Sequence, residues 1–151
     1  MTTVVTTVLT RMVARLLLAP VLMVAAAILV KGYVDVGDGF AAGVIAALGV
    51  LVQYLAFGRV AVERVLPVRH ASKLAVGGLL VALAVAFVPV LAGGAPLQHA
   101  PAAGQEVVHL GTLELISAFA FDVGVFALVL GMTVATIHLI TGAFNERSGQ
   151  A

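Results

Sequence analysis

Four long apolar runs, separated by three short connections, are the main feature of the chain. They cover about 5–30, 40–57, 74–91 and 113–140. Each run approaches or exceeds the ~20 residues that a helix needs to cross about 30 Å of hydrocarbon. The sequence after Lys31 returns to apolar runs instead of a polar mature domain, so we expect a retained first helix and not a secretory signal. The pattern predicts an all-α integral membrane protein. It is expected to be a single domain over 1–151 with about four transmembrane helices and a tail at 141–151.

The composition supports this prediction and excludes several kinds of chemistry. Hydrophobic residues make up 62% of the 151 residues and charged residues 10%, whereas soluble chains average roughly 45–50% and about 25%. The mean hydropathy is +1.19. Without cysteine there are no disulfides, thiolate metal sites or iron–sulfur ligands, so any redox centre would belong to a partner. The net charge of +1 argues against a nucleic-acid partner.

The basic residues are shared unevenly between the connections, and this predicts an orientation. Seven of the eight would lie on one side of the membrane, and only Lys31 on the other. The seven are Arg11, Arg15, Arg59, Arg64, Arg69, Lys73 and Arg147. By the positive-inside rule, both termini and the middle connection are expected in the cytoplasm of a cell-membrane protein. The connections 31–39 and 92–112 are expected outside, the latter as an irregular loop.

Asp122 is the most informative residue, because an aspartate inside a span costs ~3 kcal/mol on insertion scales. If the helix starts at Leu113, Asp122 lies about 14 Å along it, near the bilayer midplane. Thr133 and Thr136 would continue its face toward the cytoplasm. The leading hypothesis is an ion route or an anchor for another subunit. The alternative is a structural aspartate that caps a broken helix or bonds a neighbour's backbone.

Two other titratable residues of the last span have a structural and a functional interpretation. Glu114 is expected in the first helical turn, where it complements the helix dipole; alternatively it is a second station on an ion route. His138 is expected in the interface near the cytoplasmic end, and a proton relay is the alternative. We expect no metal site and no cofactor.

The first external connection is rich in glycine, which predicts a tight turn into the second span. Glycine allows positive φ and close backbone approach. This turn contains Gly37, Asp38, Gly39, Phe40 and Gly43. It lacks the lysine of a phosphate-binding loop. Its aspartates could attract cations or make local backbone hydrogen bonds, and the sequence favours neither.

Small residues form a stripe on the last span, roughly opposite Asp122. The stripe consists of Ala120, Gly124, Ala127, Gly131 and Ala135. Such stripes let helices approach closely in lipid. The last helix is therefore expected to contact one neighbour through small residues and another through Asp122. Four helices with only one clearly intramembrane acid contain too few ionisable groups for a self-sufficient pump. We therefore expect the chain to work in a larger assembly.

Two segments resemble a known family. They are GYVDVGDGFAAGVIAA, followed by YLAFG, at the first connection and the second span, and GTLELISAFAFDVGVFALVLGMTVATI in the last span. They look like the B subunit of the Mrp (Mnh) multisubunit sodium/proton antiporter, through Gly37, Gly39, Phe40 and Gly43 in the turn. In the last span the matching positions are Glu114, Leu115, Phe121, Asp122, Gly124, Val125 and Gly131. The family's usual G-H-N-x-P-G-G-G-F is here GYVDVGDGF. Roles of its histidine or proline therefore do not carry over.

The resemblance implies a small, non-enzymatic subunit of an assembly that exchanges sodium ions for protons. The implied partners are large antiporter subunits similar to those of respiratory complex I, other small membrane subunits, and lipid. The alternative is an equivalent B-like subunit of a redox-driven complex such as a membrane-bound hydrogenase. An autonomous, dimerising transporter is disfavoured, because the spans lack a second clear carboxylate and the chain has no Trp and only two Tyr.

Overall fold

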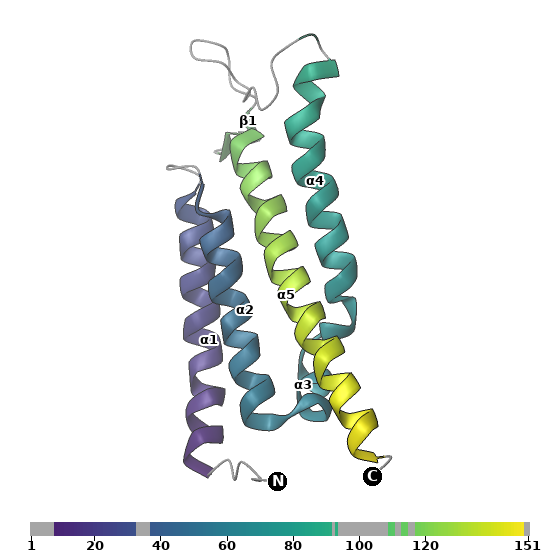
Figure 1. Ribbon diagram of the computed structural model, residues 1–151. Helices are drawn as coiled ribbons and strands as arrows, with labels where there is room; N and C mark the ends of the chain where they lie inside the picture. Colours follow the sequence, from purple (N-terminus) through teal and green to yellow (C-terminus); the bar gives the residue numbers. More distant parts are fainter. Residues whose placement is uncertain are drawn as a thin grey trace.

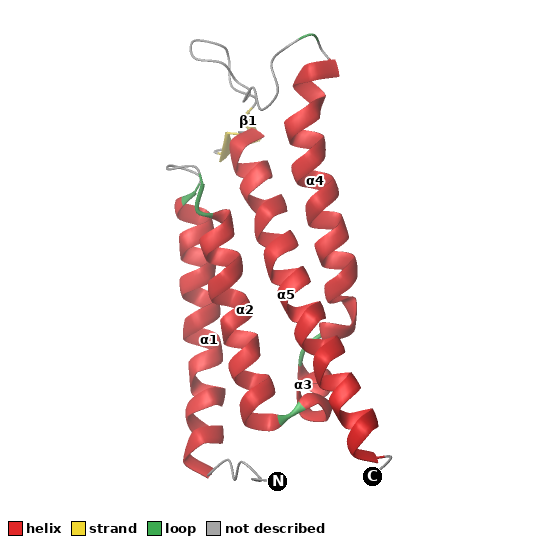
Figure 2. Ribbon diagram, in the orientation of Figure 1, coloured by secondary structure: helices red, strands yellow, loops and turns green. Residues whose placement is uncertain are grey.

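The computed structural model describes residues 8–32, 37–91, 93, 109–110, 113–114 and 117–149, and these are largely helical (Figure 2). The elements are α1 (Val8–Lys31), α2 (Gly39–Phe57), α3 (Arg59–Val65), the 3₁₀ turn η1 (Val68–His70), α4 (Ala71–Leu91), β1 (His109–Leu110), β2 (Leu113–Glu114) and α5 (Ser117–Gly149). Among the described residues four helices are long and apolar enough to cross a membrane, which confirms the predicted fold class. The described residues also include one short β hairpin, formed by β1 and β2.

The last helix differs from its predicted bounds at both ends. Residues 113–114, expected in the helix, pair with residues 109–110 in an antiparallel hairpin, and α5 begins only at Ser117. At its other end α5 continues through 141–149, where the apolar pattern predicted a tail. Because α5 has 33 residues, it is longer than one crossing requires and projects from the span.

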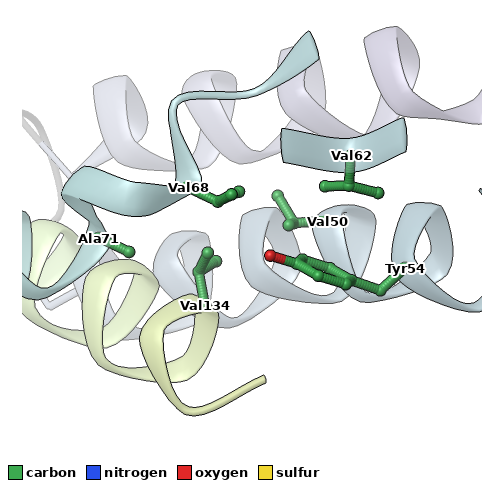
Figure 3. Close-up of a cluster of buried hydrophobic side chains, with 6 residues drawn as sticks. All are labelled: Val50, Tyr54, Val62, Val68, Ala71 and Val134. Carbon is green, nitrogen blue, oxygen red and sulfur yellow. The ribbon is translucent and has the colours of Figure 1, made fainter. Parts of the chain in front are cut away.

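The middle connection, for which the sequence predicted only a basic segment, contains the short helix α3 and the 3₁₀ turn η1. Gly58 ends α2 with a φ of 76°, a left-handed conformation that glycine adopts without strain. The chain then forms α3 and η1, whose Val62 and Val68 are buried. Figure 3 shows these valines beside four residues from the long helices. Those four are Val50, Tyr54, Ala71 and Val134. This cluster fixes α3 and η1 against α2, α4 and α5.

The long helices pack in the order α1, α2, α5, α4 (Figure 1). In the described part of the chain α1 does not contact α4, so these two form the edges of the arrangement. Half of the most apolar window of α2 is buried, against 11% in α1 and in α4. The outer faces of α1 and α4 are thus available to lipid or to other subunits.

Small residues bring α4 and α5 together. A Cβ on Gly124 would lie 2.9 Å from the backbone nitrogen of Ala82, and one on Gly131 would lie 2.7 Å from the carbonyl oxygen of Ala71. The backbones therefore touch, as expected for helices that pack in lipid without a hydrophobic driving force. The predicted small-residue contact of the last helix is confirmed, and its neighbour is α4 of the same chain.

The charges divide between the two ends of the bundle. The start of α1, the end of α5, and α3 with η1 lie at one end, here called the basic end (Figure 1). It carries Arg11, Arg15, Arg59, Arg64, Arg69 and Lys73. The α1–α2 turn with Lys31 and the β hairpin lie at the opposite end, here called the turn end. The segregation of basic residues is as predicted. Which end faces the cytoplasm stays a prediction.

Candidate functional site

Asp122 is buried in the second turn of α5, and its carboxylate contacts the glycine-rich turn. Only 4% of its surface is exposed. The backbone N–H of Gly37 donates a hydrogen bond of 2.9 Å to Asp122 Oδ2. Gly37 has a φ of 115°, in the region that favours glycine. The left-handed backbone at Gly37 is thus linked to a carboxylate 85 residues away in the sequence.

Two further glycines allow the α1–α2 turn and α2 to approach Asp122. A Cβ on Gly32 would lie 3.0 Å from Asp122 Oδ2, and one on Gly39 would overlap the backbone of Asp122. One turn further along α2, a Cβ on Gly43 would lie 3.0 Å from Cβ of Val129. Gly39 and Gly43 therefore form the face of α2 that packs on α5. The expectation that Asp122 meets a second neighbour is confirmed, and that neighbour is α2 with its turn.

An ion pair links the two ends of this turn. Lys31, the last residue of α1, places its Nζ 2.9 Å from Oδ2 of Asp38, directly before α2. Asp38 thus makes a contact that neither sequence interpretation considered. Phe40 is largely exposed, and Asp35 lies outside the described residues.

The structure corrects the predicted depth of Asp122. The residue lies five positions after Ser117, about 7.5 Å into α5 at 1.5 Å per residue, and at the level of the α1–α2 turn. It is therefore near one boundary of the span and not near the midplane. The error arose because the helix was counted from Leu113, which belongs to β2.

Glu114 also lies in β2, so the prediction of a first-turn helical position was wrong. Its Cα pairs with that of His109 in β1. A strand residue outside the helix does not complement the helix dipole in the expected way. The helical spacing from Glu114 to Asp122, on which the idea of successive stations depended, does not exist.

Thr133 and Thr136 do not continue the buried side of α5. Both are exposed in this chain, and the hydroxyl of Thr136 donates to the carbonyl of Met132, 2.8 Å away. Further along α5 the buried residues include Gly131, Val134 and Gly142. The threonines therefore face outward and do not join Asp122 in a common site.

His138 is the centre of a second polar cluster, at the basic end. Its Nδ1 lies 3.2 Å from the Tyr54 hydroxyl and 3.5 Å from Oε1 of Glu63, while its Nε2 lies 3.4 Å from Nη2 of Arg59. The Nε–H of Arg59 donates to Oε1 of Glu63. Gly142 makes room for this guanidinium, because a Cβ there would overlap it. The cluster joins α2, α3 and α5.

Only His138 of this cluster could be identified from the sequence. Tyr54, Arg59 and Glu63 come from other elements, and their relation to residue 138 depends on the packing of α3. One local signal was available: Arg59 and Glu63 are four residues apart, the spacing of an ion pair on a helix surface. The hydrogen bond from Arg59, strengthened by the positive charge of that residue, lowers the pKa of Glu63 below its usual value.

The two clusters are far apart. His138 lies sixteen positions after Asp122, about 24 Å along α5. Between them, in the described residues, the chain packs Gly43, Val50 and Val134 against their neighbours. This arrangement can fasten both ends of the bundle. It does not form a continuous series of polar groups across the span within the part of the chain that is described.

These features define a small multi-pass helical membrane protein, with a polar cluster at each end among the residues that the structure describes. The chain belongs to the family of domains related to the MnhB subunit of Na+/H+ antiporters, which it matches over residues 9–135. It is 41% identical over 116 residues to a protein of Rhizobium meliloti (strain 1021) named as the probable A/B subunit of a K(+)/H(+) antiporter. That match covers 74% of this chain but only 11% of the relative. It is also 29% identical to the B subunit of the Na(+)/H(+) antiporter of Alkalihalophilus pseudofirmus, over 72% of this chain and 74% of that protein. The family resemblance drawn from the turn and the last span is confirmed.

Proposed function

We propose that the chain is the B-type membrane subunit of a multisubunit antiporter that exchanges a monovalent cation for protons across the cell membrane. The observation that carries this proposal is the family match over residues 9–135, which takes in the first three spanning helices and most of α5. Both relatives are named as antiporter subunits, one for sodium and one for potassium. These names favour the antiporter over the redox-driven alternative, and a transport subunit over an enzyme.

The partners of this chain are the other membrane subunits of the antiporter. The Rhizobium meliloti relative is named as an A/B subunit, and the segment similar to this chain makes up 11% of it. In that relative, the segment similar to this chain is part of one chain named as both A and B subunit. This supports a contact between this chain and a separate A-type subunit. The exposed outer faces of α1 and α4 give such a partner room to bind.

The role of the chain is to support the assembly, and Asp122 contributes by holding the α1–α2 turn against α5. The supporting contacts are the Gly37 hydrogen bond and the close packing of Gly39. Asp122, Glu114, Thr133, Thr136 and His138 do not line one route in the described part of the chain. Any ion path that uses Asp122 is therefore completed by another subunit.

The basic end is proposed to face the cytoplasm, with both termini. The support is the concentration of Arg and Lys at that end, while Lys31 at the turn end is paired with Asp38. Positive charge near the ends of spans is retained on the cytoplasmic side.

The test is deletion and restoration of this chain in cells that express the whole assembly. Membrane vesicles without the chain should lose cation-dependent proton movement, and restoring it should recover the activity. An affinity-tagged copy should copurify antiporter subunits. Copurification of hydrogenase subunits, or unchanged exchange after deletion, would refute the proposal.

A further inference from the structure

Neighbouring apolar cavities with an arginine edge, here together called the groove, lie toward the basic end of the bundle. Its outer part, about 610 Å³, lies between the first turns of α1 and the end of α2 and is lined by Arg11, Arg15 and Phe57 among apolar side chains. A second cavity of about 120 Å³, between α1, α2 and α3, shares Arg15 and Phe57 with the first. Leu66 also lines a third cavity of about 350 Å³.

The arginines sit on the wall of the outer part. Arg11 and Arg15 are four residues apart on α1 and so share one side of the helix. The guanidinium carbon of Arg15 lies 5.5 Å from the centre of the Phe57 ring, a cation–π contact that holds it at the entrance. In the described part of the chain neither arginine forms an ion pair with a carboxylate, and nearby Glu63 is paired with Arg59. Within the described residues the groove therefore offers two positive charges that no carboxylate neutralises.

The groove lies within the depth of one leaflet of a bilayer. Phe57 is the last residue of α2, so Arg15 lies at the boundary of the span. The third cavity reaches Leu22, seven positions further along α1, or about 10 Å deeper. Half of a hydrocarbon core of about 30 Å is about 15 Å. The groove thus begins at the level of lipid headgroups and descends into the apolar part of one leaflet.

We propose that this groove binds one anionic phospholipid. Arg11 and Arg15 would hold its phosphate through charge-assisted hydrogen bonds. One acyl chain would lie beside Leu18 and Leu66 and fill the space between α1 and α3. A transported cation is repelled by the arginines, and a free phosphate gains nothing from the apolar walls. The inference requires only the membrane location and is independent of the antiporter function.

The test uses the purified assembly. Native mass spectrometry counts the phosphatidylglycerol retained, and its affinity is measured after delipidation by titration in detergent, with phosphatidylcholine as the neutral probe. The double variant Arg11→Gln, Arg15→Gln should bind phosphatidylglycerol roughly 30-fold more weakly, because each basic residue near an anionic surface contributes about 1 kcal/mol. The matched control is Arg64→Gln, Arg69→Gln, which removes the same charge at the basic end from residues that do not line the groove. The control should bind as the wild type does.

A second variant separates the charge from the shape of the groove. Leu18→Trp keeps both arginines and fills the cavity, so it should also reduce phosphatidylglycerol binding. The proposal is overturned if the wild-type assembly does not prefer phosphatidylglycerol over phosphatidylcholine, or if the Arg64 and Arg69 control loses as much affinity as the Arg11 and Arg15 variant. It is also overturned if the Arg11 and Arg15 variant keeps its lipid but loses a neighbouring subunit, since an acidic side chain of that neighbour would then be the occupant.

Discussion

Asp122 shows how a single carboxylate is accommodated near the boundary of an apolar span. Burial disfavours its charge unless donors surround it. The α1–α2 turn supplies the N–H of Gly37, and Gly32 leaves the space in which the carboxylate lies. The sequence could identify Asp122 and the glycines as exceptional residues, since both are local features. It could not show that they meet, because 85 residues separate them.

The first prediction separates the hydrogen bond of Asp122 from its charge. Asp122→Asn keeps an oxygen that can accept from Gly37, so the assembly should persist on native gels. Asp122→Ala leaves the Gly37 N–H without that acceptor, at a cost of about 1–3 kcal/mol, and should lower the amount of intact assembly. If the Asn variant assembles normally but its vesicles no longer exchange cations for protons, the charge itself is on an ion path and the purely structural role is refuted.

Glu63 provides a second test at the residue scale. The hydrogen bond from Arg59 lowers its pKa in the folded protein, with His138 contributing in the same direction and burial opposing it. Tyr54 also faces the cluster, across His138. A lowered folded pKa means that the contact stabilises the fold at pH values above the ordinary glutamate value of about 4.3. That stabilisation is lost as the pH falls through the folded pKa.

The measurement is a ¹³C NMR titration of the Glu63 carboxyl carbon in the protein held in lipid nanodiscs. The wild type should titrate below the ordinary glutamate range, and Arg59→Gln should return the midpoint toward it. An identical midpoint in both proteins would show that Arg59 is not the cause of the shift.

At the scale of elements, α2 and α5 form the centre of the structure through backbone contacts. The length of the apolar runs and the spacing of the small residues predicted the four spans and the two-sided packing of α5. Each of these patterns depends only on residues within one segment. The start of α5 was missed, since it depends on the pairing of 109–110 with 113–114. Similarly, α3 was missed because its burial depends on the packing of Val62 against residues of α2 and α5.

The third prediction tests this packing with two glycines in spanning helices. Gly39→Ala places a methyl group on the backbone of Asp122, so α2 must move away from α5. Overpacking of this kind typically costs about 1–3 kcal/mol. Gly77→Ala is the matched control, since a Cβ there meets nothing within 4 Å. Thermal unfolding of the purified protein should show a lower midpoint for Gly39→Ala and little change for Gly77→Ala. Equal midpoints would contradict the close α2–α5 contact.

For the whole molecule, the order α1, α2, α5, α4 determines where partners can bind. The small residues of α5 that suggested neighbouring subunits are used within the chain, against α4. The need for an assembly rests instead on the apolar outer faces of the edge helices, such as Leu9 and Met23 of α1 and Leu80 of α4. In a membrane these faces suit either lipid or other apolar helices.

The last prediction concerns the orientation of the whole molecule. The chain contains no cysteine, so single cysteines can be introduced without removing others. Val65→Cys lies on exposed α3 at the basic end and keeps every basic residue, while His99→Cys lies in the connection between α4 and β1. In intact cells a membrane-impermeant maleimide should label His99→Cys directly and Val65→Cys only after permeabilisation. The reverse pattern would place the basic end outside and refute the charge argument. Labelling of both in intact cells would contradict the four-span arrangement, because α4 alone separates these two positions across the membrane.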